Sequence, residues 1–136
     1  MADEKTFHLS IATPDRIFYE GDVIMVELNT TEGQIGVLKD HIPLTSVLSP
    51  GVCYMYESAE NVKLCALHGG FVEILQDSVT ILAEVAEWPE EIDVERAIEA
   101  QKRAERRLAE NPQGTNIARA TLALKRSVAR IEAAKK

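Results

Sequence analysis

The chain has 136 residues, of which 46% are apolar and 5% aromatic, and it carries a net charge of −7. This length suits one domain with a small appendage, and aliphatic side chains must supply most of the core. No apolar run reaches the roughly 20 residues that cross a bilayer, and the acidic, polar start is unlike a signal peptide. We therefore expect a chain that is cytosolic, or that meets a membrane only through partners.

Charge divides the sequence into two parts. Residues 1–86 carry 13 acidic and 4 basic side chains, whereas residues 96–136 carry 11 basic and 4 acidic ones. This asymmetry predicts that the two parts meet different partners, or each other. Nucleic acid is not an expected partner, because no aromatic side chain that could stack on bases follows Trp88.

The sequence contains no recognisable catalytic or metal-binding motif. Cys53 and Cys65 stand in apolar surroundings, which is typical of reduced core thiols. The three histidines have no metal-ligand spacing, and His41 and His68 belong to no nucleophile–base pattern. We interpret both as residues that orient loops through hydrogen bonds. Nothing here predicts an enzyme or a metal site.

Residues 1–86 have the pattern of short strands. Phe7, Leu9 and Ile11 alternate with polar or small residues, as in a half-buried strand. Apolar stretches follow at 23–28, 52–56, 62–67, 71–75 and 79–85, with turn signals between them that include Gly69-Gly70. Strands at this spacing predict an antiparallel β-sandwich or flattened barrel. No helix-length amphipathic stretch interrupts them, so we do not expect a parallel sheet.

Residues 87–136 have the pattern of two helices, so the fold class is α+β. Asp93 is a good N-cap for a first helix that runs to about Glu110, where Asn111-Pro112-Gln113-Gly114 ends it. Thr115 or Asn116 can cap a second helix. Its apolar stripe is predicted to be Ile117, Ala120, Leu124, Val128 and Ile131. The four-residue break between the helices favours an antiparallel hairpin.

The apolar stripes of this hairpin are thin. The first helix offers Val94, Ala97, Ala104 and Leu108, with Gln101 among them. Alanine buries little surface, so docking of the hairpin should be weak compared with the folding of the sandwich. The pattern indicates either a regulatory element that can detach or a static helical cap.

Four arginines should converge across the hairpin. Arg96 and Arg103 are seven residues apart on the first helix, and Arg126 and Arg130 are four apart on the second. Antiparallel packing brings Arg96 near Arg130, and Arg103 towards Arg126. Guanidinium groups repel one another unless an anion lies between them. The arrangement suits a nucleotide phosphate or an acidic protein segment, although ordinary solvated side chains would have the same spacing.

Several ordered motifs carry a resemblance over nearly the whole chain. Ile92-Asp93-Val94-Glu95-Arg96-Ala97 resembles the Ile/Leu-Asp-x-x-Arg-Ala motif of bacterial ATP synthase epsilon subunits that bind ATP. Leu9–Asp15 is similar to that family's first strand and turn. The later stretches that resemble the family are Glu32–Leu38 with His41–Leu44, Gly69–Ile74, Val79–Ala83, Arg103–Leu108 and Ala123–Arg126. Leu38–His41 lacks the family's Pro-Gly before histidine, and Gln34 stands where glutamate is common.

The resemblance implies a fold and a set of partners. The fold would be a sandwich of about ten strands followed by the helical hairpin. The sandwich would bind the gamma subunit and rest on the ring of c subunits, and the hairpin would reach the alpha and beta catalytic subunits and restrain ATP hydrolysis. The chain would be a non-catalytic rotor subunit, peripheral on the cytoplasmic face of a bacterial membrane.

The resemblance also implies two sets of site residues. ATP would be a regulatory ligand, with no other cofactor, and would favour the retracted hairpin. The residues carried over for ATP are Glu87, Ile92, Asp93, Arg96, Ala97, Arg103, Arg126 and Arg130. The residues carried over for the loop that contacts the c ring are Gln34, Lys39, Asp40 and His41. The alternatives are a free-standing nucleotide-sensing module of the same fold, or an adaptor that binds an acidic protein.

Overall fold

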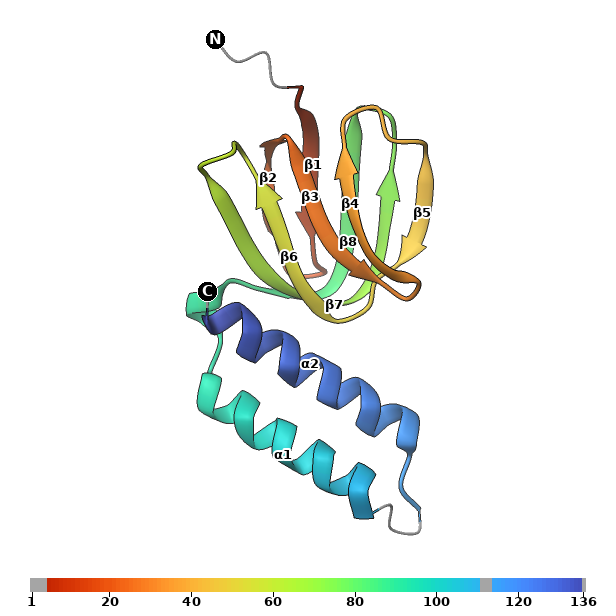
Figure 1. Cartoon of the computed structure of the whole chain (residues 1–136), viewed down its shortest axis with the longest axis vertical. Coiled ribbons are helices and arrows are strands. Elements are labelled where there is room, and N and C mark those ends of the chain that lie inside the picture. Colours follow the sequence, from red (N-terminus) through yellow and green to blue (C-terminus); the bar gives the residue numbers. More distant parts are fainter. Residues whose placement is uncertain (1–4, 111–113, 136) are drawn as a thin grey trace.

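The computed structural model describes residues 5–110 and 114–135 and has two parts, a β-sandwich and a helical hairpin (Figure 1). The strands are β1 (Phe7–Ala12), β2 (Ile17–Val23), β3 (Met25–Thr30), β4 (Gly33–Leu38), β5 (Leu44–Val47), β6 (Gly51–Tyr56), β7 (Val62–Ile74) and β8 (Ser78–Glu87). The helices are the 3₁₀-helix η1 (Pro89–Glu91), α1 (Val94–Glu110) and α2 (Ile117–Lys135). The predicted class, a sandwich followed by a two-helix hairpin, is confirmed.

The number of strands differs from the expected ten, since the described residues form eight. The turn predicted at Gly69-Gly70 is wrong, because β7 continues through it as one bent strand paired along β8. Both glycines have positive φ, and a Cβ on Gly70 would lie 2.0 Å from the Leu82 carbonyl oxygen. The bend lets β7 pair with β6 up to Leu67 and with β5 from Phe71, so it joins the two layers.

One strand pair is parallel, in a sheet whose other pairs are antiparallel as predicted. β1 and β8 pair in parallel from His8 with Ser78 to Ala12 with Leu82. These are the first and last strands of the sandwich, so no tight turn joins them and their relative direction is free. All the other pairs are antiparallel, and the order across the sheet is β2-β1-β8-β7-β6-β3-β4, with β5 paired to β7.

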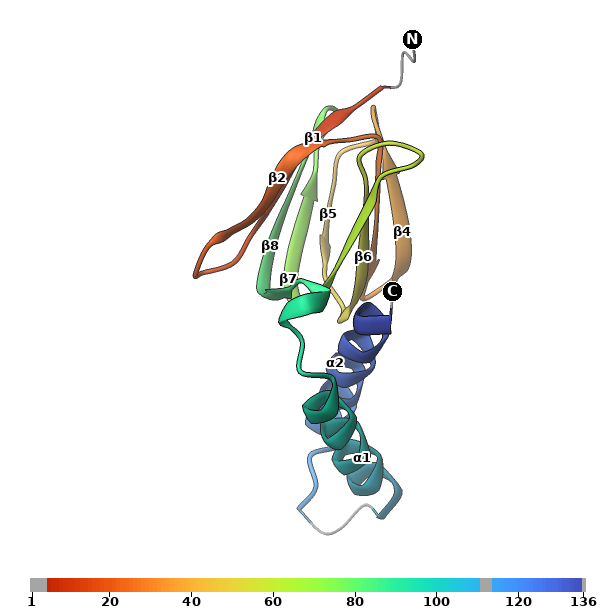
Figure 2. The same cartoon turned by 90° about the vertical axis from the view of Figure 1, so that its left-hand side faces the viewer.

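The core of the sandwich lies between its two layers, which Figure 2 shows from the side. β1 and β3 bury every second residue, the alternation expected of strands with one face on a core. The largest fully buried side chains include Leu9, Ile11, Leu28, Met55 and Ile81. Cys53 and Cys65 pair across β6 and β7 as free, buried thiols, as the sequence predicts.

The helices begin where the sequence places their caps. Asp93 Oδ1 accepts a hydrogen bond of 3.1 Å from the Arg96 backbone N–H at the start of α1. At the start of α2 the cap is Asn116, whose Oδ1 accepts from the Arg119 N–H at 3.0 Å. The helices then run antiparallel (Figure 1). The predicted break at Asn111–Gln113 lies outside the described residues.

The hairpin buries small side chains. On α1 the buried residues are Ala97 and Ala104. On α2 they are Ala120, Ser127, Ala129 and Ala133. The predicted α2 stripe is therefore correct only at Ala120: Ile117 is 54% exposed, and the other three positions are half-buried. The reason is that α2 packs against α1 on one side and against β6 and β7 on another, so small residues occupy the points of closest approach.

A short linker holds the hairpin below the sandwich. Trp88 stacks on Phe18 with ring centroids 4.2 Å apart, and Arg16 Nη2 lies 2.8 Å from Glu91 Oε1. Ile92 is buried with Val52, Ala66 and Ala133 in a small apolar cluster of its own. Neither described helix is long and apolar enough to cross a membrane.

Candidate functional site

Two adjoining cavities lie along the hairpin. The junction cavity, of about 450 Å³, is lined by Glu87, Glu91, Asp93, Arg96, Ala97, Ala100, Arg103 and Arg130. The loop-side cavity, of about 700 Å³, is lined by residues of both helices, among them Arg103, Arg107, Arg119 and Arg126. Arg103 and Ala100 line both cavities. The two cavities therefore form one basic cleft, which runs from the linker towards the far end of the hairpin.

Most of the residues expected to bind ATP meet in this cleft. Six of the eight line the junction cavity, and the chain fold brings Arg96 of α1 and Arg130 of α2 to it. Arg126 lines the loop-side cavity together with Arg103. Ile92 lines neither cavity and packs on Val52 and Ala66 of the sandwich. It anchors the hairpin beside the site.

Glu87 links the sandwich, the hairpin and the junction cavity. Its Oε1 accepts a hydrogen bond of 2.7 Å from Arg130 Nε and one of 3.0 Å from His68 Nε2. Partial burial favours the neutral acid, but the two hydrogen bonds and the charge of Arg130 outweigh it and lower the pKa of Glu87 to about 2. The side chain is therefore a carboxylate at neutral pH, and a hydrogen-bond acceptor at the cavity wall.

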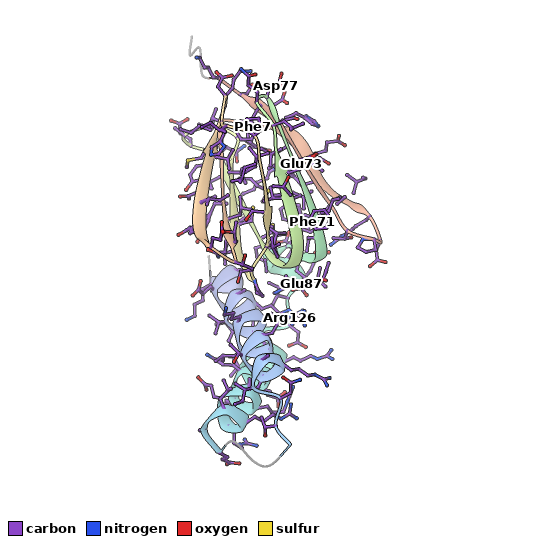
Figure 3. The ribbon with its side chains drawn as sticks, turned by 90° about the vertical axis from the view of Figure 1, so that its right-hand side faces the viewer. Phe7, Phe71, Glu73, Asp77, Glu87 and Arg126 are labelled. Carbon is purple, nitrogen blue, oxygen red and sulfur yellow. The ribbon has the colours of Figure 1, made fainter. Side chains whose placement is uncertain are left out.

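Arg126 lacks an acceptor where it needs one. Its Nη2 lies 3.8 Å from Glu84 Oε1, but its buried Nε has no hydrogen-bond partner among residues 5–110 and 114–135. A buried guanidinium N–H without an acceptor is costly. Figure 3 shows Arg126 on α2, close to the junction where Glu87 lies. Arg126 also lines the loop-side cavity, so its guanidinium group is a charged donor for an anion bound there.

The sequence prediction missed two arginines of the cleft, Arg107 and Arg119. Helical spacing contains the signal for both. Arg107 follows Arg103 by four residues and Arg119 precedes Arg126 by seven, so each pair shares a helix face. It also missed His68, which the motifs do not mark and which lies in β7 instead of a loop. The interpretation of His68 as a loop-orienting residue is therefore wrong, whereas His41 Nδ1 does donate to the Ile42 carbonyl in its loop, at 2.7 Å.

The loop expected to contact the c ring contains three of its four predicted residues. Lys39, Asp40 and His41 follow β4, and the Asp40 N–H donates to the Gln76 carbonyl at 2.8 Å. Gln34 lies within β4 and not in this loop, since the extended strand separates it from Lys39 by about 16 Å. Gln34 lies at the other end of the strand, where it lines a cavity with Leu124 and Lys125 of α2.

Comparison with known proteins gives the family. Residues 6–89 match the beta-sandwich domain of the ATP synthase Delta/Epsilon chain, and residues 90–135 match its long alpha-helix domain. The ATP synthase epsilon chain of Caldanaerobacter subterraneus is 46% identical over 133 residues, which cover 98% of this chain and 96% of that one. The epsilon chain of Halalkalibacterium halodurans is 47% identical over 130 residues, covering 95% and 97%.

Solved structures show the same fold. A chain of the mitochondrial ATP synthase of Euglena gracilis superimposes with a TM-score of 0.80 at 24% identity, covering 97% of this chain and 82% of that one. A chain from the central stalk and c ring of the Tetrahymena thermophila enzyme gives 0.56 at 14% identity, covering 98% and 97%. Fold and sequence together define a subunit of a multi-subunit ATP synthase. The chain belongs to the ATP synthase epsilon chains.

Proposed function

We propose that this chain is a non-catalytic rotor subunit whose hairpin is a nucleotide-controlled brake on ATP hydrolysis. The sandwich binds the gamma subunit and the c ring, on the cytoplasmic face of a bacterial membrane. The hairpin extends towards the alpha and beta subunits when ATP is scarce, and bound ATP holds it in the retracted form. The observation that carries this proposal is the basic cleft between α1 and α2, in a hairpin that docks weakly on the sandwich.

The cleft combines acceptors and cations that suit a nucleotide. Glu87 and Asp93 line the junction cavity and can accept hydrogen bonds from amino or hydroxyl groups. Arginines from both helices line both cavities and suit phosphate oxygens. A triphosphate would therefore bridge α1 and α2. Because the extended hairpin would lose this arrangement, ligand binding favours the retracted state.

Calorimetry and thermal melting of the isolated chain test the ATP site. We expect binding of ATP with higher affinity than ADP, and a higher melting temperature in ATP. Arg103→Ala or Arg126→Ala should each weaken binding by the equivalent of about 1.5–3 kcal/mol. Arg106→Ala is the matched control, because Arg106 is exposed on α1 and lines neither cavity of the cleft. Absence of binding at millimolar ATP would refute the site.

An apolar patch on the sandwich supports the proposed contact with gamma. Val47, Phe71 and Leu82 are register neighbours on β5, β7 and β8, and they are 56%, 49% and 45% exposed. Figure 3 shows Phe71 on β7, two positions from the exposed Glu73. Exposed apolar side chains gathered across three strands are typical of a protein interface.

Co-purification with gamma tests this patch. Phe71→Glu should abolish the complex, because it places a charge in the centre of a desolvated contact. Val62→Glu is the control, since Val62 is 40% exposed at the far end of β7 and outside the patch. Equal loss of gamma binding in both variants would show that the patch has no special role.

ATPase assays of the reconstituted soluble complex test the brake. Removing the hairpin should relieve inhibition of ATP hydrolysis while assembly continues. Inhibition by the whole chain should weaken as salt rises, because the basic helices would act through several surface charge pairs. A chain without its hairpin that inhibits as fully as the whole chain would exclude the hairpin as the inhibitory element.

A further inference from the structure

His68 is a buried side chain directly beside the candidate site, although the ATP-binding motif does not include it. It lies in β7 and is 1% exposed. Its Nε2 is 3.0 Å from Glu87 Oε1, the same oxygen that lies 2.7 Å from Arg130 Nε. A single carboxylate oxygen thus joins a buried strand of the sandwich to α2 of the hairpin.

The surroundings of the ring fix the position of its proton. Nδ1 of His68 is buried and has no hydrogen-bond partner in the described part of the chain. A proton on Nδ1 would therefore be buried without an acceptor, at the cost of an unmade hydrogen bond. The carboxylate opposite Nε2 can only accept. The ring proton accordingly sits on Nε2 and is donated to Glu87.

The hydrogen bond from His68 orients the Glu87 carboxylate and so sets the position of its second oxygen, Oε2. Oε1 of Glu87 is occupied by two donors that arrive from different parts of the molecule. Among the described residues no donor contacts Oε2, and Glu87 lines the junction cavity. The His68 side chain is 1% exposed and that of Arg130 is 32% exposed, so His68 has less room to move and restricts rotation of the carboxylate more strongly.

We propose that His68 is a positioning residue of the ATP site, which holds Glu87 so that Oε1 binds Arg130 and Oε2 accepts a hydrogen bond from the nucleotide. The inference rests on the proposed function, since the nucleotide is its ligand. A residue that only filled the core would need no polar partner, and an apolar side chain would avoid the desolvation of an imidazole. Among residues 5–110 and 114–135, the one side-chain hydrogen-bond partner of His68 is Glu87, which lines the junction cavity.

Two substitutions separate positioning from packing. The side-chain amide of His68→Gln reaches the place of Nε2 and can still donate to Glu87, whereas that of His68→Asn reaches only the place of Nδ1. We expect His68→Asn to weaken ATP binding about tenfold, the equivalent of one hydrogen bond to a charged group. His68→Gln should recover most of the affinity. Equal affinities in the wild type and both variants would overturn the inference, as would equal losses in both.

Two NMR measurements need no ATP and separate this inference from the proposed function. The ring ¹⁵N signals of wild-type His68 should show the Nε2-protonated tautomer, and an Nδ1-protonated ring would overturn the inference even if no variant folds. The pKa of Glu87, titrated by ¹³C NMR, should rise in His68→Asn and stay low in His68→Gln. If the wild type binds no ATP, the proposed function fails, while these two measurements still decide whether His68 positions Glu87.

Discussion

The sandwich core and the docking face of the hairpin differ in kind. The sandwich encloses large aliphatic side chains such as Leu9, Ile81 and Met55, each fully buried between two layers. The hairpin meets the sandwich through a cluster in which two of the four buried residues, Ala66 and Ala133, are alanines. Buried apolar area sets the stability of each contact. The hairpin is therefore held on the sandwich by far less buried apolar surface than holds the sandwich together.

Ion pairs add to the weak apolar contact between the hairpin and the sandwich. Arg130 and Arg126 of α2 lie 2.7 Å and 3.8 Å from Glu87 and Glu84 of β8. Such links depend on pH, salt and competing anions, whereas the apolar core of the sandwich does not. We therefore expect these conditions to affect the docking of the hairpin more than the stability of the sandwich, in line with the proposed function.

The largest expected effect is a difference in stability between the two regions when each is made as a separate fragment. A fragment of residues 1–91 should melt cooperatively, and a peptide of residues 92–136 should be largely unfolded, because its helices lose the sandwich and retain alanine contacts. Circular dichroism on both fragments measures this. A fragment that ends at Ala86 is the control, and should melt at lower temperature because it lacks the Trp88–Phe18 stack and the Arg16–Glu91 pair. Cooperative melting of the hairpin peptide would contradict the comparison.

The next largest effect separates the two apolar clusters by single substitutions. Leu9→Ala should lower the free energy of unfolding of the whole sandwich by about 2–5 kcal/mol, because it leaves a cavity in the core. Ala133→Asp should detach the hairpin and leave the sandwich transition where it is, because Ala133 is buried in the docking cluster and is not part of the sandwich core. Hydrogen exchange of α2 and of β1 amides distinguishes the two results. A common loss of protection in both variants would mean that the regions unfold as one.

A smaller effect is expected from pH at the link between the regions. Hydrogen bonds lower the pKa of Glu87 to about 2 in the docked state, from an ordinary value of 4.5. A depressed carboxyl pKa stabilises the docked state above pH 4.5, and this contribution is lost as the pH falls towards 2. Hairpin protection in the wild type should therefore decrease over this range. Glu87→Gln should dock more weakly and lack this component of the pH dependence.

Much of the fold follows from local sequence signals, and the misses have physical causes. Alternation in Phe7, Leu9 and Ile11 identifies a strand, and Asp93 and Asn116 are the caps that the structure uses. Periodicity does not reveal strand partners, so the parallel pairing of β1 and β8 could not be predicted. Gly69-Gly70 is a dipeptide typical of turns, but here it forms a bend within β7. Only the pairing of β7 with its neighbouring strands explains this bend.

The candidate site was predictable where helix geometry decides it. Spacing on two antiparallel helices suffices to bring Arg96 and Arg130 to one cavity. Arg107 and Arg119 also lie at helical spacings from predicted arginines, so the same rule places them on the cleft. His68 is different, because its contact with Glu87 depends on the register of β7 against β8 and on the burial of the ring. Neither quantity is local in sequence.

The smallest expected effect concerns a charge cluster on the sandwich that has no link to the hairpin. His8 Nε2 lies 3.1 Å from Glu20 Oε2, and His8 Nδ1 lies 3.4 Å from Asp22 Oδ1, on the exposed face of β1 and β2. Hydrogen bonds donated by the protonated ring to Glu20 and, second in size, to Asp22 raise the pKa of His8 above its ordinary value of 6.5. A raised histidine pKa stabilises the fold below pH 6.5, and this contribution is lost as the pH rises through the pKa of the folded state.

The measurement is the melting temperature of the 1–91 fragment from pH 5 to pH 9, compared with that of His8→Asn. The wild type should melt slightly higher at pH 5, and the two curves should converge at alkaline pH. The difference should be small and should shrink further in salt, because both partners are exposed to solvent. In the whole chain the same substitution should leave ATP binding and hairpin protection unchanged, since the cluster lies on β1 and β2 away from the junction. A change in hairpin protection would show that the sandwich and the hairpin are coupled more tightly than their separate clusters imply.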